Sequence, residues 1–574
     1  MLAVKSAFLG GMRMPGKRIV IVGGVAAGMS AAAKARRCDE SAIITVYERD
    51  SHVSYAGCGL PYHIGGVIRR REDLVIVSPA FFKDRFNVEV RVRHEVTHVD
   101  PVARTVRVRP LDGDAEYTSD YDELILATGA TSFVPPIPGA DHPYVFTLRS
   151  LHDMERIVSH LARQDMVRAV IVGGGLIGIE TAEALVQVGA RVTVVEALDR
   201  ILPFLDWDMA QSALRELEDH EVSVLTSERV LSIEEDAQEL LVRTSAGELP
   251  ANFVLIATGV RPETTLGLAA GVRLGASGAI RVDEYMRTSV DHIWAAGDCA
   301  DTVHLVTGER VWIPMGSTAN KQGRAAGANA ARGPSLSFPG VTGTTIVKVM
   351  GLHVAKTGLS EGEARRAGLQ PLVTHIHATS HAGYYPGAQP LEIKTITDRD
   401  SGRLLGAQVM GRAGVDKRID VLATAVYARL RTEDLLNLDL GYAPPFASAK
   451  DPVAIAGLVT GNARAGEFNP VTPAGLFQRL AGGDDGLVIL DVRSRAEIVQ
   501  DGVIKHGLHI PLHDLRGRLR ELQPYRDRDL VIVCRAGLRA YLAARILSQN
   551  GFDRVFVLSG GILSWRYPLD LLDE

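Results

Sequence analysis

One structural unit occurs twice in this chain of 574 residues, and no other feature constrains the fold as strongly. Each copy consists of a short apolar strand, a glycine-rich turn, a helix of small residues, a second strand and an acidic residue. The copies span residues 17–48 and 167–196, with helices expected over 29–37 and 179–188. This order is typical of the βαβ unit that binds a dinucleotide, so the sequence predicts two Rossmann-like dinucleotide-binding domains.

The two turns carry the residue types that a bound pyrophosphate needs. Glycine allows a tight bend and a close approach of the backbone to the phosphates, which lie at the N-terminus of the following helix. The acidic residue accepts hydrogen bonds from the ribose hydroxyls. In the first turn Val25 stands where the consensus has its second glycine, which leaves the phosphate geometry there open. The candidate dinucleotide-binding residues are Gly23, Gly24, Val25, Ala26, Ala27, Gly28 and Glu48 in the first copy, and Gly173, Gly175, Gly178 and Glu196 in the second.

The composition argues against several classes of partner and site. A net charge of −5 argues against nucleic acid or an acidic membrane as a partner, because proteins that bind them usually carry a basic surface. No apolar run approaches the roughly 20 residues of a membrane span. The four cysteines, Cys38, Cys58, Cys299 and Cys534, form no close pair, which argues against a disulfide framework, a zinc site and an internal dithiol. We expect no metal site and a cytoplasmic, reducing compartment.

Outside the repeated unit, the chain divides into segments of distinct pattern. Residues 1–16 are interpreted as an N-terminal extension. Residues 331–455 lack a nucleotide fingerprint and mix strand-like runs with a helix near 419–431. Residues 456–470 are rich in Gly, Ala and Asn, a composition typical of a linker. Residues 471–574 carry an α/β pattern and, at about 100 residues, are long enough to fold as a separate domain.

Three further segments distinguish the two nucleotide sites. Residues 121–129 and 253–259 both end in Ala-Thr-Gly, and residues 288–298 end in Asp298 after an apolar strand. With the two fingerprints, these segments resemble the two-dinucleotide-domain flavoprotein reductases over residues 17–455. The resemblance adds Ala127, Thr128, Gly129, Asp298 and Gly259 to the candidate cofactor-binding residues.

The resemblance implies FAD at the first fingerprint and a nicotinamide dinucleotide at the second, with Asp298 on the ribityl chain of FAD. A carboxylate at Glu196 hydrogen-bonds a free 2′-hydroxyl and repels a 2′-phosphate, so we expect NADH rather than NADPH, although Arg200 lies nearby in sequence. The implied domains are an FAD-binding domain (17–150 and 280–330), an NAD(H)-binding domain (151–279) and a dimerisation domain (331–455).

Cys58 lies ten residues after Glu48 and between two glycines, just before an expected helix start. Backbone donors that approach the sulfur and a helix N-terminus both favour the thiolate, which is the reactive form of cysteine. The surrounding spacing resembles the coenzyme A disulfide reductases and their NADH oxidase relatives, and is carried by Ser54, Cys58, Leu60, Pro61 and Tyr62. A glutathione-reductase-type enzyme would have a second cysteine a few residues away, and here there is none. The second sulfur must therefore come from the substrate.

Residues 381–387 and 441–445 resemble the interface-domain segments of the coenzyme A disulfide reductases. In that family, paired tyrosines from the partner subunit reach the active cysteine. The resemblance therefore implies a homodimer in which Tyr442 and one of Tyr384 and Tyr385, with Tyr384 preferred, protonate the leaving thiolate. It also implies contacts to substrate, including the phosphates of coenzyme A, from Lys34, Arg37, Ser54 and Lys450.

Cys534 ends an apolar strand at 530–533 and opens a loop before the helix expected over 540–547. A loop curled around a cysteine directs backbone amides at the sulfur, and Arg535 and Arg539 add positive charge, so a thiolate or persulfide anion is held there. This loop, together with residues 490–493, 510–512 and 558–565, resembles the rhodanese fold, which implies a rhodanese domain at 471–574.

The sequence thus predicts an α/β protein with two Rossmann-like dinucleotide-binding domains, an α+β dimerisation domain and a C-terminal α/β rhodanese domain. The hypothesis is that electrons pass from NADH through FAD to Cys58, which attacks a sulfur–sulfur bond in coenzyme A disulfide, a persulfide or a polysulfide. Cys534 would carry sulfane sulfur, with coenzyme A as substrate or shuttle. One alternative is an NADH oxidase or peroxidase in which Cys58 cycles through a sulfenic acid. Another is a nucleotide-binding redox or sulfur sensor.

Overall fold

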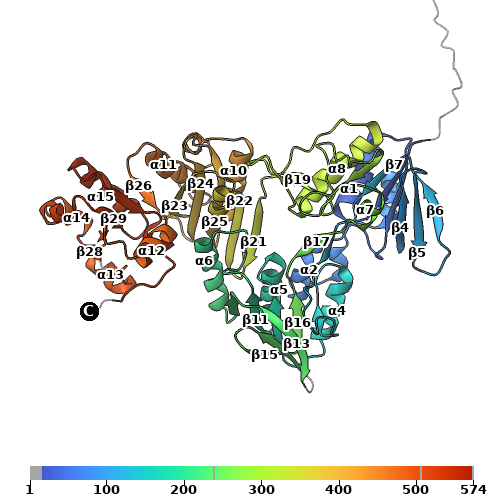
Figure 1. The fold of residues 1–574 in the computed structure, drawn as a ribbon, viewed down its shortest axis with the longest axis horizontal. Coiled ribbons are helices and arrows are strands. Elements are labelled where there is room, and N and C mark those ends of the chain that lie inside the picture. The colour runs from blue at the N-terminus through green and yellow to red at the C-terminus, as the bar shows by residue number, and fades with distance from the viewer. Residues whose placement is uncertain (1–15, 237–238, 505–506, 572–574) are drawn as a thin grey trace, which may run out of the picture. The chain divides into compact units, whose positions relative to one another are not determined.

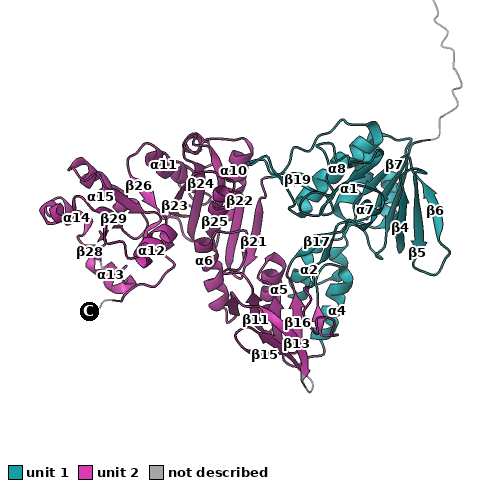
Figure 2. Ribbon diagram, in the orientation of Figure 1, with its two compact units in different colours: residues 1–134, 147–162, 259–341 teal, residues 135–146, 163–258, 342–574 magenta. Residues whose placement is uncertain are grey.

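The computed structural model describes residues 16–236, 239–504 and 507–571, which form two compact units (Figures 1 and 2). Unit 1 comprises the residues up to 134 together with 147–162 and 259–341. Unit 2 comprises residues 135–146, 163–258 and 342–574. Among the described residues, no helix is both long and apolar enough to cross a bilayer.

A parallel sheet forms the centre of unit 1. Its strand order is β18 (Ile293–Ala295), β7 (Glu123–Leu126), β1 (Arg18–Val22), β2 (Ile43–Glu48) and β3 (Glu89–Val92). The helices α1 (Ala26–Cys38) and α8 (Gly316–Arg332) pack against each other beside it. Continuous runs of apolar residues, as in β1, suit a parallel sheet whose strands are buried.

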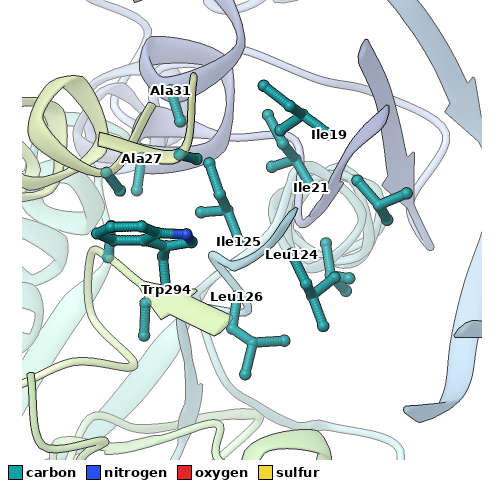
Figure 3. Packing of buried hydrophobic residues seen from close by; sticks show 14 of the residues in the cluster. Ile19, Ile21, Ala27, Ala31, Leu124, Ile125, Leu126 and Trp294 are labelled. Carbon is teal, nitrogen blue, oxygen red and sulfur yellow. The ribbon is translucent and has the colours of Figure 1, made fainter. Parts of the chain in front are cut away.

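A buried apolar core on the two faces of this sheet fixes the turn that leads from β1 into α1. Figure 3 labels its side chains, which come from four elements and are all nearly or fully buried. They are Ile19 and Ile21 from β1, Leu124, Ile125 and Leu126 from β7, Trp294 from β18, and Ala27 and Ala31 from α1. The alanines let the helix lie close to the strands, which holds the glycine-rich turn against the end of the sheet.

Smaller sheets and helices complete unit 1. The antiparallel sheet β4-β5-β6 and the pairs β8/β17 and β19/β20 are its other strands. Their bounds are β4 (His94–Asp100), β5 (Thr105–Pro110), β6 (Tyr117–Asp120), β8 (Ala130–Ser132), β17 (Val260–Pro262), β19 (Thr302–Val303) and β20 (Arg310–Val311). The remaining helices are η1 (Gly57–Gly59), α2 (Leu60–Ile64), η2 (Arg71–Leu74), α3 (Pro79–Phe86), α4 (Leu151–Leu161) and α7 (Thr265–Ala269).

The second βαβ unit belongs to a parallel sheet in unit 2. The strand order is β12 (Ser223–Thr226), β11 (Arg191–Glu196), β10 (Arg168–Val172), β16 (Phe253–Ile256) and β9 (Val145–Phe146). Its helices are α5 (Leu176–Gln187) and α6 (Trp207–Glu218). An antiparallel sheet follows α6, with strands β13 (Val230–Asp236), β14 (Glu239–Thr244) and β15 (Glu248–Ala251).

An antiparallel sheet with helices follows in the chain. Its strand order is β21 (Thr345–Val349), β22 (Leu352–Gly358), β25 (Leu404–Gly411), β24 (Pro390–Asp398) and β23 (Pro371–Thr379). The accompanying helices are α9 (Glu361–Arg366), α10 (Val415–Tyr427), η3 (Thr432–Asn437) and α11 (Pro452–Arg464). We refer to these elements as the antiparallel domain.

The C-terminal part of unit 2 is a parallel sheet with helices. The strand order is β26 (Asn469–Val471), β30 (Val555–Leu558), β29 (Asp529–Val533), β27 (Leu487–Asp491) and β28 (Gly507–His509). The helices are α12 (Pro473–Ala481), α13 (Arg495–Asp501), α14 (Leu512–Leu515), η4 (Leu519–Tyr525), α15 (Leu538–Gln549) and η5 (Gly561–Ser564). The predicted α/β fold class, with its α+β and C-terminal α/β parts, is confirmed.

Several predicted boundaries differ from the structure. The helices after the two turns begin at Ala26 and Leu176, three residues earlier than expected, because the last residues of each turn already form the first helical turn. The helix expected near 419–431 is α10, which ends at Tyr427. Residues 151–162 and 259–279, assigned to the NAD(H)-binding domain, belong to unit 1. The N-terminal extension falls almost wholly on residues that lie outside the described ones.

The segment 456–470 is not the linker that its composition indicated. Helix α11 occupies most of it, with the Asp451 side chain capping the helix through the amide of Val453 and proline at the first helical position. Small residues let α11 pack closely: a Cβ at Gly457 would lie 2.9 Å from the carbonyl oxygen of Thr432. Burial of Val453, Ala456 and Thr460 therefore outweighs the low intrinsic preference of a Gly- and Asn-containing segment for helix.

Candidate functional site

A cavity of about 1740 Å³ opens in unit 1 where β1, β2, β7 and β18 end. Rossmann-like sheets bind ligands at the carboxyl ends of their strands. The cavity exceeds the roughly 300–1,000 Å³ of ordinary small-molecule pockets, as a dinucleotide requires. Most candidate residues of the first site line it, namely Gly23, Val25, Ala26, Ala27, Glu48, Ala127, Thr128, Gly129 and Asp298. Gly24 lies in the turn and Gly28 in the first turn of α1, and neither lines the cavity.

The two acidic residues at the strand ends make the same contacts in the two βαβ units. Glu48 accepts hydrogen bonds from the amides of Gly24 (2.7 Å) and Asp50 (2.8 Å). Glu196 accepts from the amides of Gly174 and Leu198, both at 2.7 Å. Burial raises the pKa of Glu48, and these amides oppose that shift. A carboxylate offers about four acceptor positions, so each acid can hold its turn and still bind ribose hydroxyls.

Close packing explains the last glycine of each turn. A Cβ at Gly28 would lie 1.8 Å from the carbonyl oxygen of Gly23, and one at Gly178 would lie 2.1 Å from that of Gly173. Only glycine fits at these two positions, and its small size lets the first turn of each helix pack against the glycine-rich turn. Val25, in contrast, has a φ of −101°, which valine adopts without strain, and its side chain lines the cavity. The departure from the consensus therefore leaves the turn intact.

Asp298 follows β18 and lies in an ion pair that the sequence did not reveal. The guanidinium of Arg149 donates to its carboxylate at 2.7 Å, and the Trp312 indole donates to its backbone carbonyl at 2.8 Å. Arg149 also lines the cavity, as do the basic residues Arg37, Arg49, Arg71, Arg93, Arg109, Lys321 and Arg324. Cationic side chains, the buried carboxylate of Glu48 at the strand end and a cavity of this size fit FAD, with its two phosphates.

Cys58 lines the same cavity as the residues of the first fingerprint. It lies in the short helix η1, directly before α2, and its side chain is exposed. Ser54 and Tyr55 line the cavity beside it, and burial raises the pKa of Tyr55 to about 12, so its phenol stays protonated. Arg37 is also a lining residue, whereas Lys34, half-buried on α1, is not one.

A tyrosine pair lies on the surface of the antiparallel domain. The hydroxyls of Tyr384 and Tyr442 are 3.3 Å apart, although the two residues are 58 positions apart in sequence. Their exposed fractions are 76% and 51%. Tyr385 instead packs edge-on against the ring of His381, with centroids 5.6 Å apart. The hydrogen bond with Tyr442 raises the pKa of Tyr384. Of the two candidates, Tyr384 is thus the partner of Tyr442. Lys450 is exposed in the loop before α11.

The loop after β29 wraps closely around Cys534, whose side chain is buried. The amide of Gly537 donates to Cys534 Sγ at 3.1 Å, and α15 begins at the next residue. The backbone of Cys534 is held in turn, because its carbonyl accepts from the amide of Ile562 at 2.9 Å. Gly561 has a φ of +62°, and a Cβ there would lie 2.3 Å from the Cys534 carbonyl oxygen, so only glycine fits.

The two arginines expected to charge this loop differ in their environment. Arg535 is exposed. The guanidinium of Arg539 forms two hydrogen bonds with Glu497, at 2.7 and 2.5 Å, and they lower the pKa of Glu497 to about 2. The charge of Arg539 is therefore compensated by a carboxylate. Arg539 thus also links the start of α15 to α13, and its role in charging the loop stays a prediction.

Three models of known protein families match successive parts of the chain. The family model for pyridine nucleotide-disulphide oxidoreductases matches residues 17–323. The model for the dimerisation domain of the same family matches residues 344–453, and the rhodanese-like domain model matches residues 474–567.

Three relatives illustrate the similarity. The NAD(P)H sulfur oxidoreductase (CoA-dependent) of Pyrococcus abyssi is 40% identical over 440 residues, which cover 76% of this chain and 97% of that protein. The crystal structure of reduced Bacillus anthracis CoADR-RHD is 38% identical, with a TM-score of 0.92 over 96% of this chain and 98% of its own. The NAD-dependent persulfide reductase of A. fulgidus is 40% identical, with a TM-score of 0.88 over 96% of this chain and all (100%) of its own.

Proposed function

This chain belongs to the pyridine nucleotide-disulphide oxidoreductase family, and on that premise we propose that it uses NADH to reduce sulfur–sulfur bonds in coenzyme A disulfide, persulfide or polysulfide. It is an oxidoreductase that also carries a rhodanese-like domain. Similarity to both the B. anthracis and the A. fulgidus structures extends over 96% of the chain and so includes that domain.

The observation that carries the proposal is the place of Cys58 in the cavity that fits FAD. An exposed cysteine there, before a helix N-terminus, has the setting of a reactive thiolate. Unit 1 has two further cysteines that do not line the cavity. Cys38 is half-buried at the end of α1, and Cys299 is buried with its thiol directed at the carbonyls of Leu126 and Ala296, both at 3.4 Å. Burial raises the pKa of Cys299, so it stays a thiol. Cys58 is therefore the cysteine suited to attack a substrate.

The residues of unit 1 have distinct tasks in this proposal. FAD, when bound, would supply the redox chemistry, namely acceptance of a hydride from NADH and donation of an electron pair to sulfur. Glu48 binds a ribose, Asp298 binds the ribityl chain, and the arginines of the cavity bind the phosphates. The Cys58 thiolate attacks one sulfur of the substrate, forming a mixed disulfide and releasing the other sulfur as a thiolate. Arg37, Ser54, Lys450 and Lys34 are the proposed contacts to coenzyme A.

The leaving thiolate requires a proton. We propose that the chain forms a homodimer in which Tyr384 of the partner subunit donates this proton. The hydroxyl of Tyr384 is hydrogen-bonded to that of Tyr442 in the same subunit. A phenol with a raised pKa remains protonated at neutral pH and can therefore donate.

The tyrosine assignment predicts a loss of turnover. Tyr384→Phe and Tyr442→Phe should each lower kcat roughly 100-fold, because a positioned general acid typically contributes 10²–10⁴-fold. The pH profile of kcat, measured with coenzyme A disulfide, should lose the limb that reports the tyrosine. Tyr427→Phe is the matched control, since Tyr427 is another exposed tyrosine of the antiparallel domain. Equal kinetics for all three variants would refute the assignment.

The environment of Glu196 supports NADH as the nucleotide. Arg200, the nearest basic residue in sequence, donates to Asp199 at 2.7 Å and to the carbonyl of Leu205 at 3.1 Å. Its charge is therefore compensated, while Glu196 stands at the strand end where a 2′-phosphate would lie.

Steady-state kinetics test the function as a whole. We expect kcat/KM to be at least about tenfold higher for NADH than for NADPH, a difference of about 1.4 kcal/mol. Coenzyme A disulfide, coenzyme A persulfide and polysulfide should each accelerate NADH oxidation under argon. If these acceptors have no effect and oxygen uptake in air accounts for all the NADH consumed, the protein is an oxidase or peroxidase. Slow turnover with every acceptor would favour a sensor.

A further inference from the structure

We propose that Glu392, on β24 of the antiparallel domain, positions the Cys534 loop through Ser564. Part of the sulfane-transfer site would then lie outside the rhodanese-like domain. This inference rests on the proposed role of Cys534 as a carrier of sulfane sulfur.

Glu392 is buried at the point where β24 meets the segment 559–566. The Ser564 hydroxyl donates to its Oε1 at 2.7 Å, and the Arg566 guanidinium donates to its Oε2 at 2.9 Å. His377, on the neighbouring strand β23, contacts the Ser564 hydroxyl at 2.8 Å. Two strands of the antiparallel domain thus hold one serine of the other domain from two sides.

The segment that contains Ser564 is hydrogen-bonded to the backbone of the Cys534 loop. The amide of Ile562 donates to the carbonyl of Cys534 at 2.9 Å, and that of Leu563 donates to the carbonyl of Arg535 at 3.0 Å. Gly561, which has no side chain, allows the two backbones to approach this closely. A shift of Ser564 would move these amides and, with them, the loop that directs the Gly537 amide at the sulfur.

Glu392 belongs to a larger network of buried charges. His375 lies between Glu392 (3.3 Å) and Asp208 of α6 (3.2 Å), and Lys394 pairs with Asp208 at 2.9 Å. The amide of His375 also donates to the Ser559 hydroxyl at 2.8 Å. Burial opposes ionisation of Glu392, but the histidines and Arg566 outweigh it and lower its pKa to about 2. Glu392 is therefore a carboxylate at neutral pH, with its charge fixed by its surroundings.

Other contacts attach the rhodanese-like domain independently of Glu392. The ring of Tyr567 stacks on Trp207 of α6, with centroids 4.9 Å apart, and on Phe477 of α12, at 3.9 Å. Loss of one hydrogen bond at Glu392 should leave these aromatic contacts in place. A change at Glu392 is thus expected to alter the position of the loop while the domain stays attached.

The test uses the full-length protein with FAD bound, and the variants Glu392→Gln and Ser564→Ala. Ser564→Ala removes a single hydroxyl and guards against the case in which Glu392→Gln fails to fold. With thiosulfate as donor and cyanide as acceptor, kcat for sulfane transfer should fall roughly 10- to 100-fold, as misplacement of a reacting group by about 1 Å produces. Reduction of coenzyme A disulfide should stay within twofold of wild type.

A second readout separates positioning from general stability. In a Cys58→Ser background, the alkylation rate of Cys534 by iodoacetamide is followed against pH by peptide mass spectrometry. A loosened loop exposes the buried sulfur of Cys534, so alkylation should be faster at each pH in both variants. Glu363→Gln is the matched control, because Glu363 pairs with Lys356 and caps α9 within the antiparallel domain.

The outcomes distinguish this inference from the proposed function. Wild-type transfer rates and an unchanged alkylation profile in both variants would overturn the role of Glu392 and leave the function standing. That role would also be wrong if Glu363→Gln impaired transfer as much as Glu392→Gln does, or if disulfide reduction fell in parallel. If the wild-type protein transfers no sulfane sulfur, the role of Cys534 fails, and the alkylation profiles still decide whether Glu392 positions the loop.

Discussion

Replacement of Cys58 by serine is expected to lower the NADH-dependent reduction of coenzyme A disulfide at least about 10³-fold, because a serine hydroxyl is a far weaker nucleophile than a thiolate and forms no mixed disulfide. The cavity residues that fit FAD are untouched by this change, so flavin content per chain should equal that of the wild type. The measurements are kcat/KM with coenzyme A disulfide and the flavin absorbance released on denaturation.

Cys38→Ser is the matched control for this variant, since Cys38 is a half-buried cysteine of the same unit, at the end of α1. A readout that needs no turnover is thiol labelling of the reduced protein. The wild type and Cys38→Ser should each show a rapidly alkylated cysteine that maps to residue 58. If Cys58→Ser retains disulfide reduction, the electron outlet lies elsewhere and the proposed function is wrong.

Local sequence patterns were sufficient to predict the two βαβ units and the strand, loop and helix around Cys534. The strands β1 and β10 lie within one residue of their expected starts, because each is an apolar run that ends at a glycine turn. The loop at Cys534 was predicted for the same reason, since strand, cysteine loop and helix are contiguous in sequence. Features of this kind depend on residues within about 30 positions of one another.

Partners that lie far apart in sequence could not be predicted in this way. Arg149 pairs with Asp298 across 149 residues, and Ser564 with Glu392 across 172. A charged residue in a sequence shows its own type but not the carboxylate that compensates it, as Arg539 and Glu497 illustrate. Helix α11 was missed because tertiary packing of its small residues stabilises it. A composition rich in small residues, taken alone, indicates a linker.

The tyrosine pair could be predicted from the sequence only in part. Tyr384 and Tyr442 were named from a resemblance, and their hydroxyls are within hydrogen-bonding distance. The choice between Tyr384 and Tyr385 could not be made from sequence, because adjacent residues of a loop point in different directions. Their contribution to a partner's site remains a prediction that the phenylalanine variants test.

The two cysteines that we propose to be reactive lie in different units, Cys58 in unit 1 and Cys534 in unit 2, so their chemistry should separate on mutation. Cys534→Ser should abolish sulfane transfer from thiosulfate to cyanide, at least about 10³-fold, because the sulfur that forms the persulfide is gone. The reduction of coenzyme A disulfide, which the proposal assigns to Cys58, should remain within twofold of wild type. Arg535→Ala, which leaves the sulfur and removes an exposed charge beside it, is the control that should retain measurable transfer. Both activities are measured on the same preparation with bound FAD. An equal loss of both in Cys534→Ser would mean that the two cysteines act as one site, and the proposed separation of reduction from sulfur carriage would be wrong.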